Sequence, residues 1–239
     1  MKTEIRSYID GKWTAPKAGR TVRGVNPADT AETVAEFVSA GEKETLEAVE
    51  AARRAFAEWQ AVPAPKRGRF VARVADIARA RAEEIAAAMT REEGKLLREA
   101  RGEVSKGLNL LEYYAGAGFR MSGDTVPSEI ADCFTYTIRR PLGIAGLITP
   151  WNFPWAIPAW KIAPALVAGN TVVFKPAELT PQTATLLVRF FEEAGLPPGV
   201  LNMVVGPGSA VGEAIVRHPD VRAVSFTGSN EVGRRGIEE

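Results

Sequence analysis

The stretch TVVFKPAE, residues 171–178, decides the fold of this chain, because a short apolar strand ends there in a lysine, a proline and a glutamate. A helix is predicted after this strand, and strand and helix alternate along the chain on both sides of it. Strands that alternate with helices of this length predict βαβ units, which form a Rossmann-like parallel sheet with helices on both faces, an α/β fold. The expected strands are residues 143–149, 171–174, 201–205 and 223–226. Four helices are expected: one that ends at Ala168, one over residues 182–194, one over residues 209–217, and one that begins near Ser229.

Asn152 follows the first of these strands and lies between Pro150 and Pro154. Parallel sheets bind ligands beyond the carboxyl ends of their strands, so chemistry is expected there. The two prolines stiffen the connection, and Pro154 suits the first turn of the next helix. A side-chain amide held in this way can donate a hydrogen bond to a developing oxyanion. The alternative is that Asn152 caps the helix.

Lys175 and Glu178 follow the second strand. A cation and a carboxylate at a parallel-strand end can bind a ribose, with Glu178 accepting hydrogen bonds from the two hydroxyl groups. The same carboxylate would repel a 2′-phosphate, which favours NAD over NADP. The alternative is a surface ion pair, which adds little to stability.

Gly206-Pro207-Gly208 follows the third strand, with Gly212 after it. The spacing departs from G-x-G-x-x-G by one residue, which disfavours another Rossmann-type reductase. Such glycines form a tight turn or let an adenine or ribose approach closely. Ser229, after the fourth strand, stands where a helix begins. It can cap that helix, or the helix N-terminus can bind a phosphate.

The front of the chain is predicted to be mostly helical. Apolar residues recur at three- and four-residue steps, which indicates helices over Glu42–Trp59, Lys66–Thr90 and Glu99–Phe119. Asp10-Gly11 predicts a small surface hairpin over Tyr8–Trp13. Asp132–Arg139 alternates and predicts a strand, with Phe134, Tyr136 and Ile138 on one face and Cys133 on the other.

The charge balance and the cysteine count exclude several classes of function. Lys and Arg number 30 and Asp and Glu 29, so neither nucleic acid nor an anionic membrane is an expected partner. One cysteine excludes an internal disulfide framework and a Cys-rich zinc site, and no metal is expected. The N-terminus lacks the apolar core of a signal peptide, and no apolar run approaches the roughly 20 residues of a membrane span. A cytoplasmic location is expected.

Four motifs in this order resemble the aldehyde dehydrogenase superfamily: TPWNFP (149–154), AWKIAPALVAGNTVVFKPAELTP (159–181), GLPPGVLNMVVGPG (195–208) and SFTGS (225–229). YIDGKW (8–13) and NPADT (26–30) extend the resemblance to the front of the chain. The resemblance implies oxidation of a small-molecule aldehyde to a carboxylic acid with NAD, with NADP as the alternative. Within the family the chain looks most like dehydrogenases of semialdehydes, such as the 2-oxoglutarate semialdehyde type.

The resemblance also implies a role for individual residues. Asn152 matches the amide that holds the oxyanion, and Lys175 and Glu178 match the pair on the adenosine ribose. The strand near Phe134 resembles an oligomerisation hairpin and implies a homo-oligomer. The other matches are Ile148, Pro150 and Trp151 along the cofactor path, Gly208 and Gly212 beside the adenosine half, Ser229 at the pyrophosphate, and Phe226, Thr227, Gly228 and Val232 around the cofactor.

Three parts of the aldehyde dehydrogenase fold are therefore expected: a helical part of the cofactor-binding domain (1–120), an oligomerisation hairpin (121–140) and dinucleotide-binding βαβ units (141–239). In the family, the nucleophilic cysteine and the general-base glutamate lie beyond the SFTGS motif. Cys133 precedes the dinucleotide unit and is interpreted as structural. His218 suggests no Cys–His pair.

Two hypotheses follow for the activity of the chain. It is the front part of an NAD-dependent enzyme without the catalytic domain, and is inactive alone. Alternatively, it is a non-catalytic module that binds a dinucleotide weakly or only packs with partners. In both cases apolar surface is left bare, which predicts self-association or poor solubility.

Overall fold

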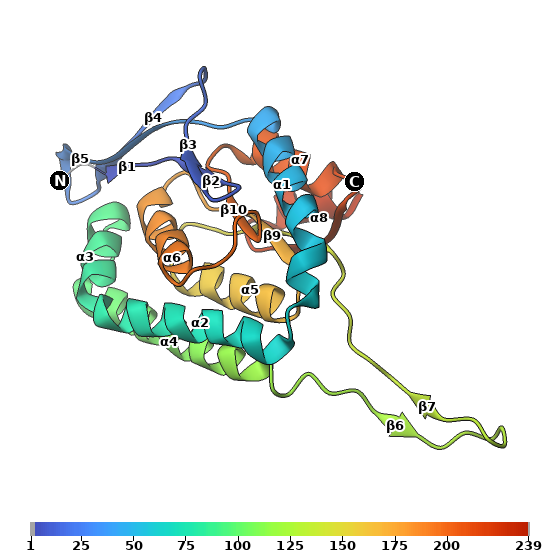
Figure 1. The fold of residues 1–239 in the computed structure, drawn as a ribbon. Coiled ribbons are helices and arrows are strands. Elements are labelled where there is room, and N and C mark those ends of the chain that lie inside the picture. The colour runs from blue at the N-terminus through green and yellow to red at the C-terminus, as the bar shows by residue number, and fades with distance from the viewer. Residues whose placement is uncertain (1–2, 239) are drawn as a thin grey trace.

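A computed structural model describes residues 3–238, and its central feature is a parallel sheet with helices on both faces (Figure 1). Six strands of this described part form the sheet in the order β11-β8-β9-β10-β2-β3. The first four are mutually parallel, and β2 and β3 extend the sheet in antiparallel fashion. Their bounds are β11 Val221–Phe226, β8 Ile144–Ile148, β9 Thr171–Lys175, β10 Leu201–Met203, β2 Ser7–Ile9 and β3 Lys12–Thr14. The predicted fold class is confirmed.

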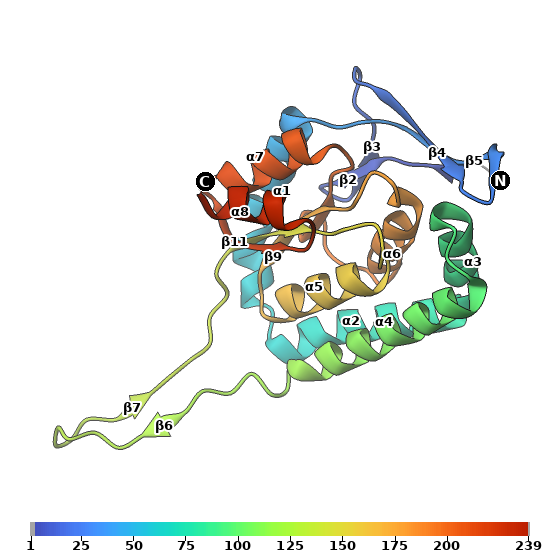
Figure 2. The same ribbon diagram turned by 180° about the vertical axis from the view of Figure 1, so that it is seen from behind.

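Helices cover the two faces of the sheet as the βαβ pattern predicts. Figure 2 shows α5 and α6 on one face, with α2 and α4 outside α5, while α1 and α7 lie on the other. The fully buried side chains Trp59, Trp155, Phe174, Phe190 and Phe191 belong to the core between these layers. The helices are α1 Glu42–Ala61, α2 Ala64–Ala80, α3 Ala82–Glu93, α4 Leu97–Ala117, α5 Ala156–Val167, α6 Pro181–Glu193, α7 Glu213–Arg217 and α8 Asn230–Glu238.

The predicted helix over Lys66–Thr90 is wrong, because the chain forms two helices that break at Arg81. Arg81 has φ −118° and ψ 24°, outside the helical range. Its side chain pairs with Glu193 and lies over the Phe190 ring, both on α6. Tertiary packing therefore sets a break that the helical spacing does not show.

The front of the chain also holds strands that the helical prediction missed. β1 (Thr3–Glu4), β5 (Asp29–Val38) and β4 (Thr21–Asn26) form a separate three-stranded sheet of the described chain. In β5 the first three residues are exposed and the buried Val34 and Ala35 are adjacent, so the strand shows no regular alternation of apolar and polar residues. The Asp10-Gly11 hairpin is confirmed as β2–β3, with positive φ at both turn residues. It is not the surface flap expected, because β2 pairs with β10 at the edge of the main sheet.

Two further elements differ from their predictions. The helix over 209–217 begins as a π-helical turn, η1 (Gly208–Gly212), before α7. The strand over Asp132–Arg139 shrinks to β7 (Thr135–Tyr136), which pairs with β6 (Thr125–Val126). These two strands form a long ribbon that projects from the body (Figure 1). An isolated two-stranded ribbon has no second layer to bury its side chains, so only a short ladder forms.

Within residues 3–238, no helix combines the length and the apolar character that crossing a membrane requires.

Candidate functional site

The carboxyl ends of three parallel strands form one row. Ile148 is the register partner of Lys175 on one side and of Phe226 on the other. The backbone bonding continues past the strands, since Thr149 N–H donates to Lys175 O over 3.2 Å and Thr227 N–H donates to Ile148 O over 3.1 Å. The loops that carry the predicted site residues therefore leave the sheet side by side, as the sequence predicts.

Gly212 approaches this row from the connection after β10. A Cβ built on Gly212 would lie 3.9 Å from both Ile148 Cδ1 and Lys175 Cδ, so η1 packs onto the two strand ends. Gly208, at the start of η1, is exposed and has open space around it. The two glycines thus border the surface expected to receive the adenosine half of a dinucleotide.

Lys175 is buried at the end of β9, and only 6% of the residue is exposed. Its Nζ donates to the Pro176 carbonyl over 3.0 Å. Burial lowers the pKa of Lys175 to about 8, and the nearby Glu178 carboxylate opposes that shift. The Lys175 ammonium group is therefore buried beneath the loop and fixed by a hydrogen bond, and it is not a mobile cation on the surface.

Glu178 is held by residues from the front of the chain. Its Oε1 accepts a hydrogen bond from Ser39 Oγ over 2.8 Å and lies 3.4 Å from Arg20 Nη2. Its side chain is still 20% exposed. A carboxylate can accept about four hydrogen bonds, so capacity for ribose hydroxyls remains. The ion pair expected as the alternative is thus present in the structure, and the carboxylate keeps further acceptor positions open.

The Asn152 loop is fixed through its backbone. Lys95, which follows α3, donates from Nζ to the Asn152 carbonyl oxygen over 2.9 Å and lies 4.5 Å from the centre of the Phe153 ring. Lys95 also pairs with Glu103 and with Glu93. The main chain at Asn152 is thus anchored while the residue itself stays exposed and its side-chain amide can face a ligand.

Glu103 caps the helix that follows this loop. Its Oε1 accepts from the backbone N–H groups of Trp155 and Ala156 over 2.9 and 3.0 Å. A carboxylate at a helix N-terminus satisfies free N–H groups and complements the helix dipole. The prediction that Pro154 lies in the first helical turn is wrong, since α5 begins at Ala156. Asn152 does not cap α5 either.

Ser229 caps α8, as one of its two interpretations predicts. Its Oγ accepts from the Val232 N–H over 3.3 Å. The start of α8 borders a pocket of about 740 Å³ lined by Phe226, Thr227, Gly228, Ser229, Asn230, Gly233 and Arg234. The Phe226 ring packs on Gly228 so closely that a Cβ there would collide with it. Val232 is 51% exposed at the same helix end.

The model of the Aldehyde dehydrogenase family matches residues 13–239. The chain belongs to this family.

Relatives and solved structures agree with the assignment. The chain is 48% identical over 228 residues to an alpha-ketoglutaric semialdehyde dehydrogenase of Bacillus subtilis, covering 95% of this chain and 47% of that protein. It superposes with TM-score 0.95 on an Escherichia coli NADP dependent enzyme, 38% identical, covering 98% of this chain and 49% of that one. PnpE in complex with nicotinamide adenine dinucleotide gives TM-score 0.94 at 37% identity, covering 99% and 48%. The chain spans about half the length of the relatives it matches.

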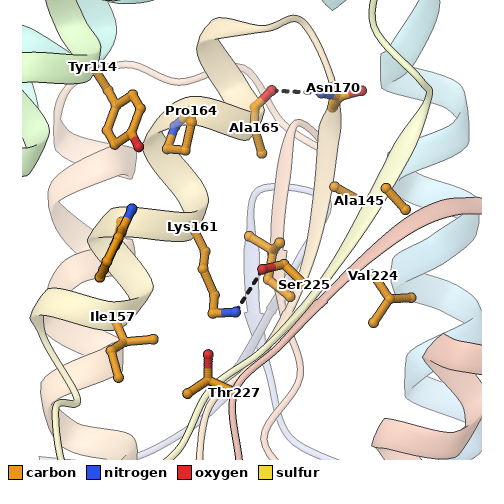
Figure 3. Close-up of a pocket in the computed structure, with 13 residues that line it drawn as sticks. Tyr114, Ala145, Ile157, Lys161, Pro164, Ala165, Asn170, Val224, Ser225 and Thr227 are labelled. Atoms are coloured by element: carbon orange, nitrogen blue, oxygen red, sulfur yellow. Dashed lines mark hydrogen bonds between the residues drawn. The ribbon is translucent and has the colours of Figure 1, made fainter. Parts of the chain in front are cut away.

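A second pocket of this family member, of about 510 Å³, lies between α5 and β11 (Figure 3). Figure 3 shows Lys161 of α5 pointing into it, with Nζ donating to Ser225 Oγ over 2.7 Å. Burial lowers the pKa of Lys161 to about 8. Trp160 and Tyr114 add aromatic surface to the lining.

Several residues of the site carry no signal in the sequence motifs. Arg20 and Ser39 contact Glu178 from 158 and 139 positions away, and Glu103 contacts Trp155 from 52 positions away. Lys161 lies inside the motif of residues 159–181, but its spacing is that of an ordinary helix residue. Cys133 is exposed and lies in the chain between β6 and β7. These two strands belong to the ribbon that projects from the body, away from the main sheet (Figure 1).

Proposed function

We propose that the whole protein oxidises an aldehyde to a carboxylic acid with NAD or NADP, and that this chain supplies the dinucleotide site and the oxyanion donor. The observation that carries the proposal is the row formed by Phe226, Ile148 and Lys175 at one edge of the sheet. This row brings the Asn152, Glu178 and Ser229 loops to one edge, where open α/β sheets bind ligands.

The residues present fit a dinucleotide. Glu178 offers carboxylate oxygens to ribose hydroxyls, and Gly212 leaves space beside them. The N-terminus of α8, next to Ser229, offers free N–H groups and a partial positive charge to a pyrophosphate. Ile148, Pro150, Trp151, Thr227 and Val232 would line the path between these points. A bound NAD or NADP supplies the acceptor for the hydride of the aldehyde carbon.

Asn152 is the residue of this chain that acts on the aldehyde. Its side-chain amide donates a hydrogen bond to the carbonyl oxygen as negative charge develops there. Lys95 holds the backbone of Asn152, so the donor needs little reorganisation when the reaction occurs. We assign the nucleophilic thiol and the general-base carboxylate to no residue of this chain, and Cys133 on the ribbon is not the nucleophile.

The substrate and the assembly follow from the relatives and the surface. We infer a semialdehyde substrate that carries a carboxylate, since the B. subtilis relative is named for one. We also infer a homo-oligomer, because Phe134, Tyr136 and Ile138 on the ribbon are 72%, 58% and 55% exposed. The proposed location is the cytoplasm.

Calorimetric titration of the chain with NAD tests the proposal. Glu178→Gln removes the charge but keeps the shape, and a charge-assisted hydrogen bond contributes about 1.5–3 kcal/mol, so the dissociation constant should rise about tenfold or more. Glu129→Gln on the ribbon makes the same charge change away from the site and should leave binding unaltered. Quenching of Trp151, which is 54% exposed, gives an independent signal, and Trp151→Phe should remove it. Absence of NAD binding by the folded chain would overturn the proposal.

A further inference from the structure

Arg20 lies on the segment between β3 and β4, where no motif points to a function. Its carbonyl oxygen accepts a hydrogen bond from Ser39 N–H over 2.9 Å, which ties this segment to the end of β5. Gly19 allows the close approach, because its φ is +152° and a Cβ there would lie 2.7 Å from the Ser39 carbonyl oxygen. The backbone of Arg20 is therefore held in a fixed position beside Ser39.

The Arg20 and Ser39 side chains contact the same carboxylate in different ways. Ser39 is 9% exposed, and its hydroxyl donates to Glu178 over 2.8 Å. The Arg20 side chain is 68% exposed, and its Nη2 lies 3.4 and 3.5 Å from the two Glu178 oxygens. These distances are long for a charge-assisted hydrogen bond. The serine is a fixed support for Glu178, whereas the arginine can move to another anion at little cost.

Two cations offset the negative charge of Glu178, so the site does not repel a phosphate. Arg20 faces the carboxylate from solvent, and the charge of Lys175 acts on it from the buried side. Within the described part of the chain, Nε and Nη1 of Arg20 have no hydrogen-bond partner. A guanidinium group matches two phosphate oxygens at once, which suits Arg20 to an anion placed next to Glu178.

We propose that Arg20 determines the cofactor preference by binding the 2′-phosphate of NADP, so that this site accepts NADP as well as NAD. The inference rests on the proposed function, because it places the adenosine ribose at Glu178. When the ribose carries a 2′-phosphate, the guanidinium leaves the carboxylate for the phosphate, and when the 2′-oxygen is a free hydroxyl, Glu178 accepts its hydrogen bond. The expectation that Glu178 by itself favours NAD is thereby refined, because the carboxylate is half of an ion pair.

Calorimetric titrations of the chain with NAD and with NADP test this role. Loss of the guanidinium in Arg20→Ala should weaken NADP binding about tenfold or more and change NAD binding by less than about twofold. Arg20→Lys keeps a point charge without the planar pair of donors and should give an intermediate affinity for NADP. Arg23→Ala, three residues further along in β4 and hydrogen-bonded to Thr33, is the matched control and should leave both affinities unaltered.

The phosphorus NMR signal of the 2′-phosphate gives a readout that a merely structural role would not move. A guanidinium beside the phosphate favours its dianion, so the pKa of the bound 2′-phosphate should be higher in the Arg20→Ala complex than in the wild-type complex. NADP binding should also weaken with added salt more steeply in the wild type than in Arg20→Ala.

The outcomes separate the two proposals. If NAD binds and Arg20→Ala leaves the ratio of NADP to NAD affinity unchanged, the role of Arg20 is refuted and the proposed function stands. If the wild-type chain binds NAD but not NADP, the role of Arg20 is refuted as well. If neither dinucleotide binds the folded chain, both proposals fail.

Discussion

Glu103 Oε1 accepts the backbone N–H of Trp155 over 2.9 Å, which joins α4 of the outer helical layer to the residue that immediately precedes α5. The other oxygen of the same carboxylate pairs with Lys95, which in turn holds the Asn152 carbonyl. One buried carboxylate therefore supports both the start of α5 and the loop proposed to stabilise the oxyanion. Its side chain is 1% exposed, so solvent cannot replace these contacts.

Replacing Glu103 with alanine should destabilise the chain strongly. The change leaves two N–H groups at the start of α5 without their acceptor and removes one of the two carboxylates that pair with Lys95. Removing one partner of a buried ion pair costs about 3–5 kcal/mol. Urea unfolding of the wild type and of Glu103→Ala measures the difference. Glu112→Gln on the same helix, where Glu112 is half-exposed, is the control and should change stability by less than about 1 kcal/mol. Equal stability of Glu103→Ala and wild type would contradict the capping role.

Glu92 makes stability depend on pH in the opposite sense to an ordinary paired carboxylate. It lies almost fully buried and accepts the backbone N–H groups of Gln182 and Thr183 at the start of α6. Burial raises its pKa to about 7 from an ordinary value of 4.5. The folded state thus binds more protons than the unfolded state between these values, so stability falls as pH rises through this window.

The contribution of Glu92 should be fully present below pH 4.5 and lost by about pH 7, an effect on the order of 3 kcal/mol. Glu92→Gln cannot ionise, so it should remove this slope whatever its own constant effect on stability. The free energy of unfolding, measured in urea at intervals between pH 5 and 8, gives both slopes. Parallel curves for wild type and variant would show that Glu92 does not titrate in this range.

The strands, and the edge of the sheet at which they end, could be predicted from the sequence. The contacts that distant segments make at this edge could not. The apolar run ending at Lys175 and the glycine-rich connection ending near Gly212 are local signals, and the parallel sheet follows from their alternation. The capping of α5 by Glu103 and the contact between Arg20 and Glu178 join segments far apart in the chain. Hydrogen bonds of this kind leave no periodicity, because each depends on how separate layers pack.

The same reason explains the errors of the helical prediction. Arg81 carries no helix-breaking side chain, yet its contacts with α6 end α2 there. In β5 the buried residues Val34 and Ala35 are adjacent, and the register between β4 and β5 shifts near Val25, so the regular alternation that marks a strand is missing. The ribbon does show the alternation, but its apolar face stays in solvent, with Phe134, Tyr136 and Ile138 72%, 58% and 55% exposed.

The exposed ribbon should hold copies of the chain together. Apolar side chains at Phe134 and Ile138 would be buried between copies, since exposed patches of this kind mark association surfaces. Size-exclusion chromatography with light scattering should find the wild type as a dimer or larger, and Phe134→Ser with Ile138→Ser should shift it toward the monomer. Leu46→Ser, a 43% exposed position on α1, should leave the assembly unchanged. A monomeric wild type would refute the inferred oligomer.

Gly107 and Gly102, both inside α4, should respond in opposite ways to alanine. A Cβ at Gly107 would collide with the indole ring of Trp155, which is fully buried next to α4. A Cβ at Gly102 would meet nothing within 4 Å. Overpacking a filled core costs about 1–3 kcal/mol, whereas alanine at an open helical position stabilises by about 0.5–1 kcal/mol.

The two variants make the same Gly→Ala change in the same helix and differ only in what surrounds the new Cβ. Comparing them therefore separates the effect of close packing from that of helix propensity. Gly107→Ala should lower the urea midpoint and shift the fluorescence of Trp155, while Gly102→Ala should raise the midpoint and leave the emission unchanged. Since Trp155 also donates its backbone N–H to Glu103, the displacement in Gly107→Ala should reach the Asn152 loop and weaken quenching of Trp151 by NAD. If Gly107→Ala is as stable as Gly102→Ala, α4 and α5 do not pack as closely as the contact between Gly107 and Trp155 requires.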